Sequence, residues 1–276
     1  MRIARVFPRR TSASPTDPLA YFDYPTLYDE ADEVRVSCTW TWDREKAEDL
    51  AREWRAVTKN VLIGGPAYDD PGGEFIPGEY IKPGLVFTSR GCPNKCWFCY
   101  TPKREGSIRL LEVKEGYNIL DSNILACPDE HIKKVFAMLS RQPERPRFTG
   151  GLDAELVRPW IAQEVVKLRP SSAYFAYDTP ESFAPLADAW ALFRASGENN
   201  SGRAYQVYVL IGHKGDTLTK ARERLEKVLR LGLLPLAMLY NKGAEAEGAG
   251  WGMLQREYAN KFIVGAKLSK LKGGLA

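Results

Sequence analysis

The stretch SRGCPNKCWFCY, residues 89–100, decides the interpretation of the whole chain, because it carries three cysteines within eight residues. Cys92, Cys96 and Cys99 follow the spacing C-x3-C-x2-C. Thiolates gathered this closely favour a metal centre. A closed structural zinc site or an electron-transfer cluster takes four protein ligands, whereas this stretch offers three. Its spacing also differs from the ferredoxin run C-x2-C-x2-C-x3-C and from the separated cysteine pairs of zinc knuckles.

The stretch resembles the signature of the radical SAM superfamily, in which three cysteines have this spacing and an aromatic residue, here Phe98, precedes the last one. In that superfamily the cysteines hold three irons of a 4Fe-4S cluster, and the fourth iron binds S-adenosylmethionine. The resemblance implies that Cys92, Cys96 and Cys99 are the metal ligands of a radical SAM enzyme. It also implies reductive cleavage of S-adenosylmethionine to a 5′-deoxyadenosyl radical, which abstracts hydrogen from an unidentified substrate and so leads to modification or rearrangement. Flavodoxin or ferredoxin would be the electron donor.

Two other interpretations of the cysteines stay open. The chain could be an iron-sulfur electron-transfer or redox-sensing protein, which requires a fourth protein ligand such as Cys127. It could also be a zinc-stabilised nucleic-acid-binding module, in which Cys127, His131 or His213 completes a zinc site. Loss of Cys127 would destroy the metal centre of the electron-transfer protein but would leave the radical SAM cluster intact.

The composition is that of an ordinary globular chain, with 276 residues, 44% of them hydrophobic and 27% charged. Its longest apolar stretch, residues 228–240, is interrupted by Arg230, Gly232 and Pro235, so we expect no contact with a membrane. The first ten residues are basic but lead into no apolar segment, unlike a secretory signal. We therefore expect a cytoplasmic protein.

The charge balance does not by itself indicate nucleic acid, because 39 basic residues face 35 acidic ones and leave a net charge of +4. A nucleic-acid partner is therefore unsupported. Lys103, Arg104 and Arg109 nevertheless follow the cysteines closely. Such a group is either solvated surface charge or a docking site for an acidic reductase or an anionic substrate.

From Leu85 onward, short β-rich runs alternate with amphipathic segments at a spacing of about 25 to 33 residues, the size of a βα unit. This alternation predicts an α/β fold with a parallel sheet. The resemblance implies a partial (β/α)6 barrel, similar to a TIM barrel, over residues 81–245, followed by a C-terminal extension, 246–276. The expected strands are 85–88, 117–120, 146–149, 172–177, 204–211 and 233–239.

Polar residues and glycines follow these runs, where the reactive groups of βα barrels gather. They are Asp121, Asn123, Gly150, Gly151, Asp153, Asp178, His213, Tyr240 and Asn241. The resemblance implies that the backbone near Phe98 contacts the adenine of S-adenosylmethionine, that residues near Asn123 contact its methionine moiety, and that Asp178 contacts its ribose. Gly151 is assigned to the same cofactor. The alternative for Asp153, Asp178 and Asp216 is helix capping or turn formation.

Residues 1–80 form a separate N-terminal segment with a linker. Residues 34–40 alternate like a strand, a helix follows Asp43, and a second short strand, residues 61–63, ends at Gly64-Gly65-Pro66-Ala67. This βαβ unit resembles a truncated, Rossmann-like cobalamin-binding domain of one branch of radical SAM proteins. Cobalamin is not expected as a cofactor, because no histidine precedes His131. We expect the segment to act as a lid or an additional sheet.

Overall fold

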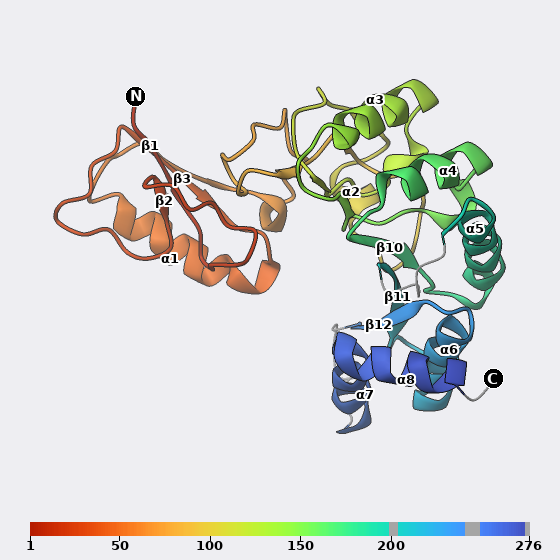
Figure 1. Ribbon diagram of the computed structural model, residues 1–276. Coiled ribbons are helices and arrows are strands. Elements are labelled where there is room, and N and C mark those ends of the chain that lie inside the picture. Colours follow the sequence, from red (N-terminus) through yellow and green to blue (C-terminus); the bar gives the residue numbers. More distant parts are fainter. Residues whose placement is uncertain (199–203, 241–248, 274–276) are drawn as a thin grey trace. The chain divides into compact units, whose positions relative to one another are not determined.

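The computed structural model describes residues 1–198, 204–240 and 249–273. The chain divides into two compact units, Met1–Ser122 (unit 1) and Asn123–Ala276 (unit 2) (Figure 1). Both units combine helices with parallel strands, so the predicted α/β class is confirmed at this level. No helix among the described residues has the length and apolar character needed to span a membrane.

The N-terminal sheet of unit 1 has four parallel strands in the order β2-β1-β3-β4. These strands are β1 (Ile3–Val6), β2 (Ala20–Tyr21), β3 (Glu33–Ser37) and β4 (Val61–Gly64). Helix α1 (Arg44–Trp54) connects β3 to β4, which confirms the predicted βαβ unit. The predicted apolar side of α1 is buried, namely Ala47, Leu50, Ala51 and Trp54.

Strands β1 and β2 were not predicted, so the N-terminal sheet is larger than one βαβ unit. Strand β1 is only four residues long, and the charged Arg5 interrupts its apolar run in the sequence. In the fold, Ala4 and Val6 are fully buried and Arg5 is 8% exposed. The arginine is buried because its guanidinium binds other parts of the chain, which a sequence pattern does not reveal.

The remainder of unit 1 is built from short elements. Strand β5 (Leu85–Val86) pairs in parallel with β8 (Asn118–Ile119). Between them, β6 (Ser89–Arg90) and β7 (Arg109–Leu110) form an antiparallel ribbon, and α2 (Thr101–Arg104) lies in the loop that joins them. Two 3-10 helices, Thr41–Asp43 and Pro66–Tyr68, complete the unit.

Unit 2 alternates strands and helices along the chain, and its parallel strands have the order β12-β11-β10-β9. Each of the six runs predicted in the sequence contains a strand, and these strands are β5 and β8 of unit 1 and β9 to β12 of unit 2. The elements of unit 2 are α3 (Asp129–Ser140), β9 (Arg147–Phe148), α4 (Pro159–Leu168), β10 (Ser172–Ala176), α5 (Phe183–Ala195), β11 (Tyr205–Ile211), α6 (Leu218–Arg230), β12 (Leu234–Leu239), α7 (Ala249–Ala259) and α8 (Lys261–Gly273), with 3-10 helices Ile124–Ala126, Ala154–Leu156 and Pro180–Ser182.

Alternating side chains of β10 explain why this sheet carries helices on one face. Phe175 is buried and packs edge-on against Phe193 of α5, with ring centroids 5.6 Å apart. In Figure 1, α5 and α6 lie along the same side of β10, β11 and β12. On the other face, Tyr174 stacks on Tyr208 of β11, with centroids 4.7 Å apart. An aromatic pair therefore marks the face of the sheet that points away from α5.

Of Asp153 and Asp216, two aspartates considered as helix caps, only Asp153 is one. Asp153 caps the 3-10 helix Ala154–Leu156, because its carboxylate accepts from Glu155 N at 3.2 Å. Asp216, in contrast, is not the cap of α6. The capping residue is Thr217, whose hydroxyl accepts from Lys220 N at 3.2 Å. The sequence offers both residues as caps, and the choice depends on a longer-range partner of Asp216.

Candidate functional site

The three cysteines lie in one loop, residues 91–108, between the two strands of the β6–β7 ribbon. Backbone hydrogen bonds close the base of this loop. Cys92 N donates to Gly106 O at 3.0 Å, and Leu111 N donates to Thr88 O at 2.9 Å. The cysteine loop is therefore held at both ends by a short sheet, although its own backbone is largely irregular.

Gly91 is required at the start of the cysteine loop. Its φ is +86°, in the left-handed region that side chains other than glycine rarely adopt. A Cβ at this position would lie 2.2 Å from Ser107 O and 2.7 Å from Gly106 O. Gly91 N donates to Glu105 Oε2 at 2.9 Å. The close approach of the two ends of the loop thus depends on the missing side chain.

Glu105 is the charged anchor of the loop and is 7% exposed. Its Oε1 accepts from Arg104 Nη2 at 2.6 Å and from Arg104 Nε at 3.2 Å. Arg90 Nη1 is 4.0 Å from the same oxygen, and the Arg90 guanidinium stacks on the Phe87 ring at 3.7 Å from its centroid. Burial lowers the pKa of Arg90 from its ordinary value, although Glu105 opposes that effect.

Asp121 ties the segment before the cysteines to the strand β8. Its carboxylate is fully buried and accepts from Thr88 N at 2.7 Å, Thr88 Oγ1 at 2.6 Å and Ser89 Oγ at 2.6 Å. A buried carboxylate is stable when several donors compensate for the lost hydration. Asp121, expected in the rim of a site, therefore positions the residues that lead into the cysteine loop.

The cysteines differ in exposure: Cys96 is exposed, whereas Cys92 and Cys99 are half-buried. Cys99 N donates to Cys96 O at 3.1 Å, so the last two cysteines lie on one tight turn. Phe98 is half-buried and packs edge-on against Trp97, with ring centroids 5.3 Å apart. Among the described residues, no three or more His, Cys, Asp or Glu side chains are arranged to hold a metal ion.

The donor set of the loop still fits an iron-sulfur cluster in its chemistry. Residues 91–100 contain three thiols and no carboxylate or imidazole. Thiolate ligands are the donors that iron-sulfur clusters and zinc prefer. Because the backbone between the anchored ends is largely irregular, the loop can adjust to a bound metal without disturbing the ribbon.

The other predicted cofactor residues belong to unit 2. Asn123 is 4% exposed, and its Nδ2 donates to Asp153 Oδ2 at 2.9 Å. Gly151 follows β9 with a φ of +104°, and the next residue, Leu152, donates its N–H to Tyr174 O at 2.7 Å. Asn123 lies shortly after β8, and Asp153 lies shortly after β9. The structure therefore brings together two residues that were predicted to follow neighbouring strands.

Asp178 follows β10 and accepts from Leu210 N of β11 at 3.1 Å. Burial raises its pKa to about 6, and the Leu210 hydrogen bond and the charge of Arg224 only partly oppose this. A carboxyl with a pKa this close to neutral sits in an apolar, partly enclosed place. Asp178 is the strongest candidate for a functional carboxylate in unit 2.

His213 and Asp216 take part in a structural network. Asp216 Oδ2 accepts from Arg224 Nη2 at 2.7 Å and from Gly212 N at 3.0 Å. His213 Nδ1 lies 3.0 Å from Lys214 O. Tyr240 N donates to Ile211 O at 2.9 Å, which extends the β11–β12 pair, and Asn241 lies outside the described residues.

Cys38 and Cys127 are both buried. Burial raises the pKa of the Cys38 thiol, which disfavours the thiolate that a metal needs. Both are therefore placed as small core residues.

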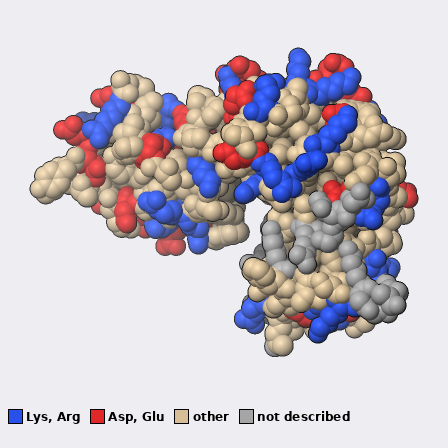
Figure 2. Space-filling view, in the orientation of Figure 1, with Lys and Arg blue, Asp and Glu red and all other residues tan. Residues whose placement is uncertain are grey.

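The basic residues after the cysteines are largely engaged within the chain. Arg104 binds Glu105, and Arg109 Nη2 donates to Pro71 O and Gly72 O, each at 2.9 Å. Lys103 is exposed. On the face drawn in Figure 2, Lys and Arg side chains are interspersed with Asp and Glu. Arg104 and Arg109 are therefore better explained as surface or structural charges than as a docking site for a reductase or an anionic substrate.

No pattern in the sequence points to Arg90, Glu105 or the role of Asp121. The signal for Gly91 was present, because a glycine beside the first cysteine indicates a tight turn. The pairing of Gly91 with Glu105 joins residues on opposite sides of the loop and has no local pattern.

Comparison of the chain with models of known protein families finds no match, and comparison with curated proteins finds none.

Proposed function

We propose that this protein is a radical SAM enzyme that binds a 4Fe-4S cluster through Cys92, Cys96 and Cys99. The observation that carries the proposal is the C-x3-C-x2-C stretch with Phe98 at its aromatic position, on a loop that follows the first strand of the predicted βα series. Three cysteines, rather than four, suit a cluster that keeps one iron available to a small molecule.

Bound there, the cluster supplies the one-electron reduction of S-adenosylmethionine that yields methionine and the 5′-deoxyadenosyl radical. The protein holds and orients the reactants and keeps water away from them. Gly91, Glu105 and Asp121 fix the base of the cysteine loop. The hydrogen bonds at the base join the two ends of the loop that carries the three thiols.

Four residues are proposed to bind S-adenosylmethionine. The backbone near Phe98 would contact the adenine, residues near Asn123 the methionine moiety, and Asp178 the ribose, with Gly151 assigned to the same molecule. Above its pKa of about 6 the Asp178 carboxyl is mostly ionised. It can then accept hydrogen bonds from ribose hydroxyls, which supports its assignment. The positive φ of Gly151 leaves its backbone open to close approach.

The wider proposal includes a partial (β/α)6 barrel, a cytoplasmic location, and flavodoxin or ferredoxin as electron donor. The parallel strands and alternating helices support the barrel. Cobalamin is not proposed, because no histidine precedes His131 in the chain. Substrate and subsequent reaction are left open, with modification or rearrangement as the general class.

Anaerobic reconstitution with iron and sulfide tests the metal assignment. We expect about four irons per chain, with the brown absorbance of a cluster. Cys92→Ala, Cys96→Ala and Cys99→Ala should each abolish stable cluster binding, because each removes one of three thiolates. Iron content and the visible spectrum provide the measurement.

Cys38→Ala and Cys127→Ala are the matched controls, since both cysteines are buried and lie outside the loop. Both variants should retain the cluster. An intact cluster in any of the three loop variants would refute the assignment. Loss of the cluster in Cys127→Ala would instead favour an electron-transfer protein with four ligands, and a colourless protein with bound zinc would favour the zinc module.

A further inference from the structure

Unit 1 contains a cavity of about 790 Å³ at the carboxyl ends of strands β1, β3 and β4. The strand order β2-β1-β3-β4 places β2 on one side of β1 and β3 on the other. The chain therefore changes direction across the sheet between β1 and β3. In open parallel sheets, ligands bind outside the carboxyl ends of the strands at such a point. The volume is within the range of sites for small molecules.

The wall of the cavity combines aromatic rings with hydroxyl groups. Several of the hydroxyl groups come from the turn after β1, where Thr11 N donates to Ser14 Oγ at 2.8 Å. Phe75 packs edge-on against Phe87, with ring centroids 5.8 Å apart. The aromatic and hydroxyl residues of the wall include Phe7, Thr11, Ser14, Trp40, Phe75 and Phe87. Such a wall suits a planar ligand with a polar substituent.

Two of the three arginines in the wall are neutralised by carboxylates. Arg9 donates to Asp43 through Nε at 3.0 Å and Nη2 at 2.8 Å. Arg35 donates through Nη1 to Glu79 at 3.0 Å and through Nε to Glu33 at 2.5 Å. The positive charges of Arg9 and Arg35 are therefore already balanced by carboxylates of the chain.

Arg90, the third arginine, is held differently. Its side chain is 18% exposed, and its buried Nε has no hydrogen-bond partner among the described residues. The carboxylate of Glu105 is 4.0 Å from Arg90 Nη1 and already accepts from Arg104 and Gly91. A largely buried guanidinium with an unsatisfied Nε and few hydrogen bonds to the chain is suited to pair with a ligand.

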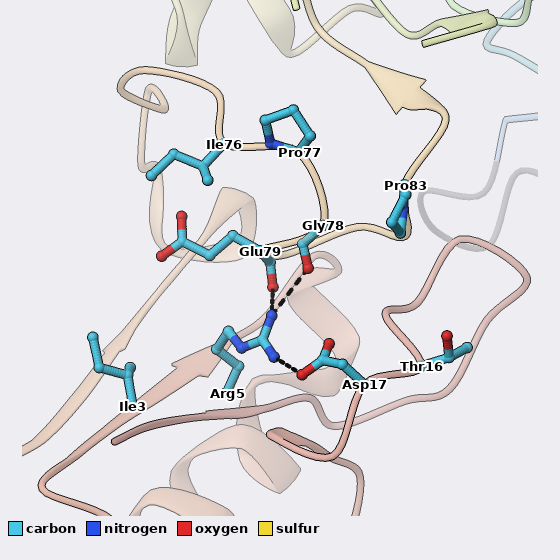
Figure 3. Close-up of a pocket in the computed structure, with 9 residues that line it drawn as sticks. All are labelled: Ile3, Arg5, Thr16, Asp17, Ile76, Pro77, Gly78, Glu79 and Pro83. Atoms are coloured by element: carbon cyan, nitrogen blue, oxygen red, sulfur yellow. Dashed lines mark hydrogen bonds and ion pairs between the residues drawn. The ribbon is translucent and has the colours of Figure 1, made fainter. Parts of the chain in front are cut away.

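A smaller cavity of about 560 Å³ in unit 1 provides a comparison. Figure 3 shows Arg5 at its wall, with dashed lines to the carbonyl groups of Gly78 and Glu79 and to the carboxylate of Asp17. The chain itself thus satisfies Arg5. The contrast identifies Arg90 as the arginine that is poised for an external anion.

Several contacts hold the Arg90 guanidinium in place. It stacks on Phe87 at 3.7 Å from the ring centroid. Gly72 approaches it so closely that a Cβ there would lie 3.1 Å from Arg90 Cζ. Arg109 fixes this approach by donating to Pro71 O and Gly72 O. The group is therefore preorganised, which reduces the entropic cost of binding.

We propose that the large cavity of unit 1 binds a small planar molecule that carries a carboxylate or phosphate group, with the anion paired to Arg90 and the ring among the aromatic side chains. Guanidinium groups recognise both anions through paired N–H donors. None of the three cysteines lies in the wall of this cavity, and the proposed ligand does not require the cluster. Its test can therefore fail while the cluster assignment stands.

Isothermal titration of the 276-residue chain, without iron, compares two matched pairs of probes. Adenosine 5′-monophosphate is compared with adenosine, and indole-3-acetate with the uncharged tryptophol. At least one anionic member should bind about tenfold or more tightly than its neutral partner, the usual gain from a charge-assisted hydrogen bond. The pair that shows this preference distinguishes phosphate from carboxylate.

Arg90→Gln should abolish the preference for the anion, and Arg90→Lys should restore part of it. Arg10→Gln is the matched control, because Arg10 also stacks on a phenylalanine, Phe22, at 3.9 Å, but lies outside the wall of the cavity. Wild-type protein that binds neither anion at millimolar concentration, or binds each pair equally, overturns the proposal. Equal loss in Arg10→Gln also overturns it. The wild-type comparison remains decisive even if an Arg90 variant fails to fold.

Discussion

Single residues in this protein acquire their properties from burial and from distant partners. Asp178 and Asp121 are both aspartates that follow strands of the predicted βα series, yet their surroundings differ. Asp121 accepts three hydrogen bonds from Thr88 and Ser89. Asp178 has one backbone donor, Leu210, and its pKa is raised to about 6 by burial. Asp121 therefore acts as a structural anchor, whereas Asp178 has the character of a site residue.

The raised pKa of Asp178 makes stability depend on pH in a defined direction. Between the unfolded value of 3.8 and the folded value of about 6, the folded chain binds the extra proton. Stability is thus present at low pH and is lost as the pH rises through about 6. Asp178→Asn should escape this loss. Its advantage over wild type should be larger at about pH 8 than at about pH 4.5 by about 2 kcal/mol.

Urea unfolding of both proteins at the two pH values measures this difference. Asparagine keeps an oxygen that can accept from Leu210 N, so the substitution removes mainly the ionisable proton. An equal effect of Asp178→Asn at both pH values would show that the carboxyl titrates normally in the fold.

At the scale of elements, the cysteine loop depends on the close contact of its two ends. Gly91 and Gly106 both have positive φ, +86° and +73°. Only Gly91 lacks room for a side chain, because no atom lies within 4 Å of a Cβ built on Gly106. The two glycines therefore separate backbone strain from steric overlap within one loop.

Gly106→Ala should lower the free energy of unfolding by about 1 kcal/mol, the cost of a left-handed alanine. Gly91→Ala should cost at least about 2 kcal/mol more, since its Cβ overlaps a carbonyl oxygen. Thermal and urea unfolding provide the comparison. Similar losses in the two variants would mean that the loop ends adjust and that their contact does not restrain the cysteines.

The elements that local patterns specify were predictable from the sequence. Helix α1 was expected from the spacing of Ala47, Leu50, Ala51 and Trp54, all of which are buried. The six runs after Leu85 each contain a strand. Strands β1 and β2 were missed because they are short and one of them includes a buried arginine, Arg5.

The candidate site was only partly predictable. The spacing of the cysteines indicates metal ligands, but it does not indicate which residues hold the cysteine loop in place. The cysteine triplet and Phe98 stand out in the sequence, and their metal role stays a prediction. Glu105 and Asp121 bind residues 14 and 32 or 33 positions away, and no local pattern specifies such pairs. Arg90 is a candidate binding residue because it stacks on Phe87 and lines a cavity. Both features are visible only in the folded chain.

At the scale of the whole molecule, each unit contributes a distinct set of candidate groups. Unit 1 holds the cysteine loop and the cavity beside Arg90. Unit 2 holds Asn123, Gly151 and Asp178. Cleavage of S-adenosylmethionine is the activity that would require the cysteines and the proposed cofactor residues together, and it does not require knowledge of the substrate.

The most direct test of the central claim is the formation of 5′-deoxyadenosine by the full chain. Reconstituted protein is reduced anaerobically with dithionite in the presence of S-adenosylmethionine, and the nucleoside is quantified by liquid chromatography. We expect 5′-deoxyadenosine from wild type and from Cys127→Ala, and none from Cys96→Ala. A cluster that forms but yields no 5′-deoxyadenosine, with a spectrum that S-adenosylmethionine leaves unchanged, would contradict the radical SAM assignment.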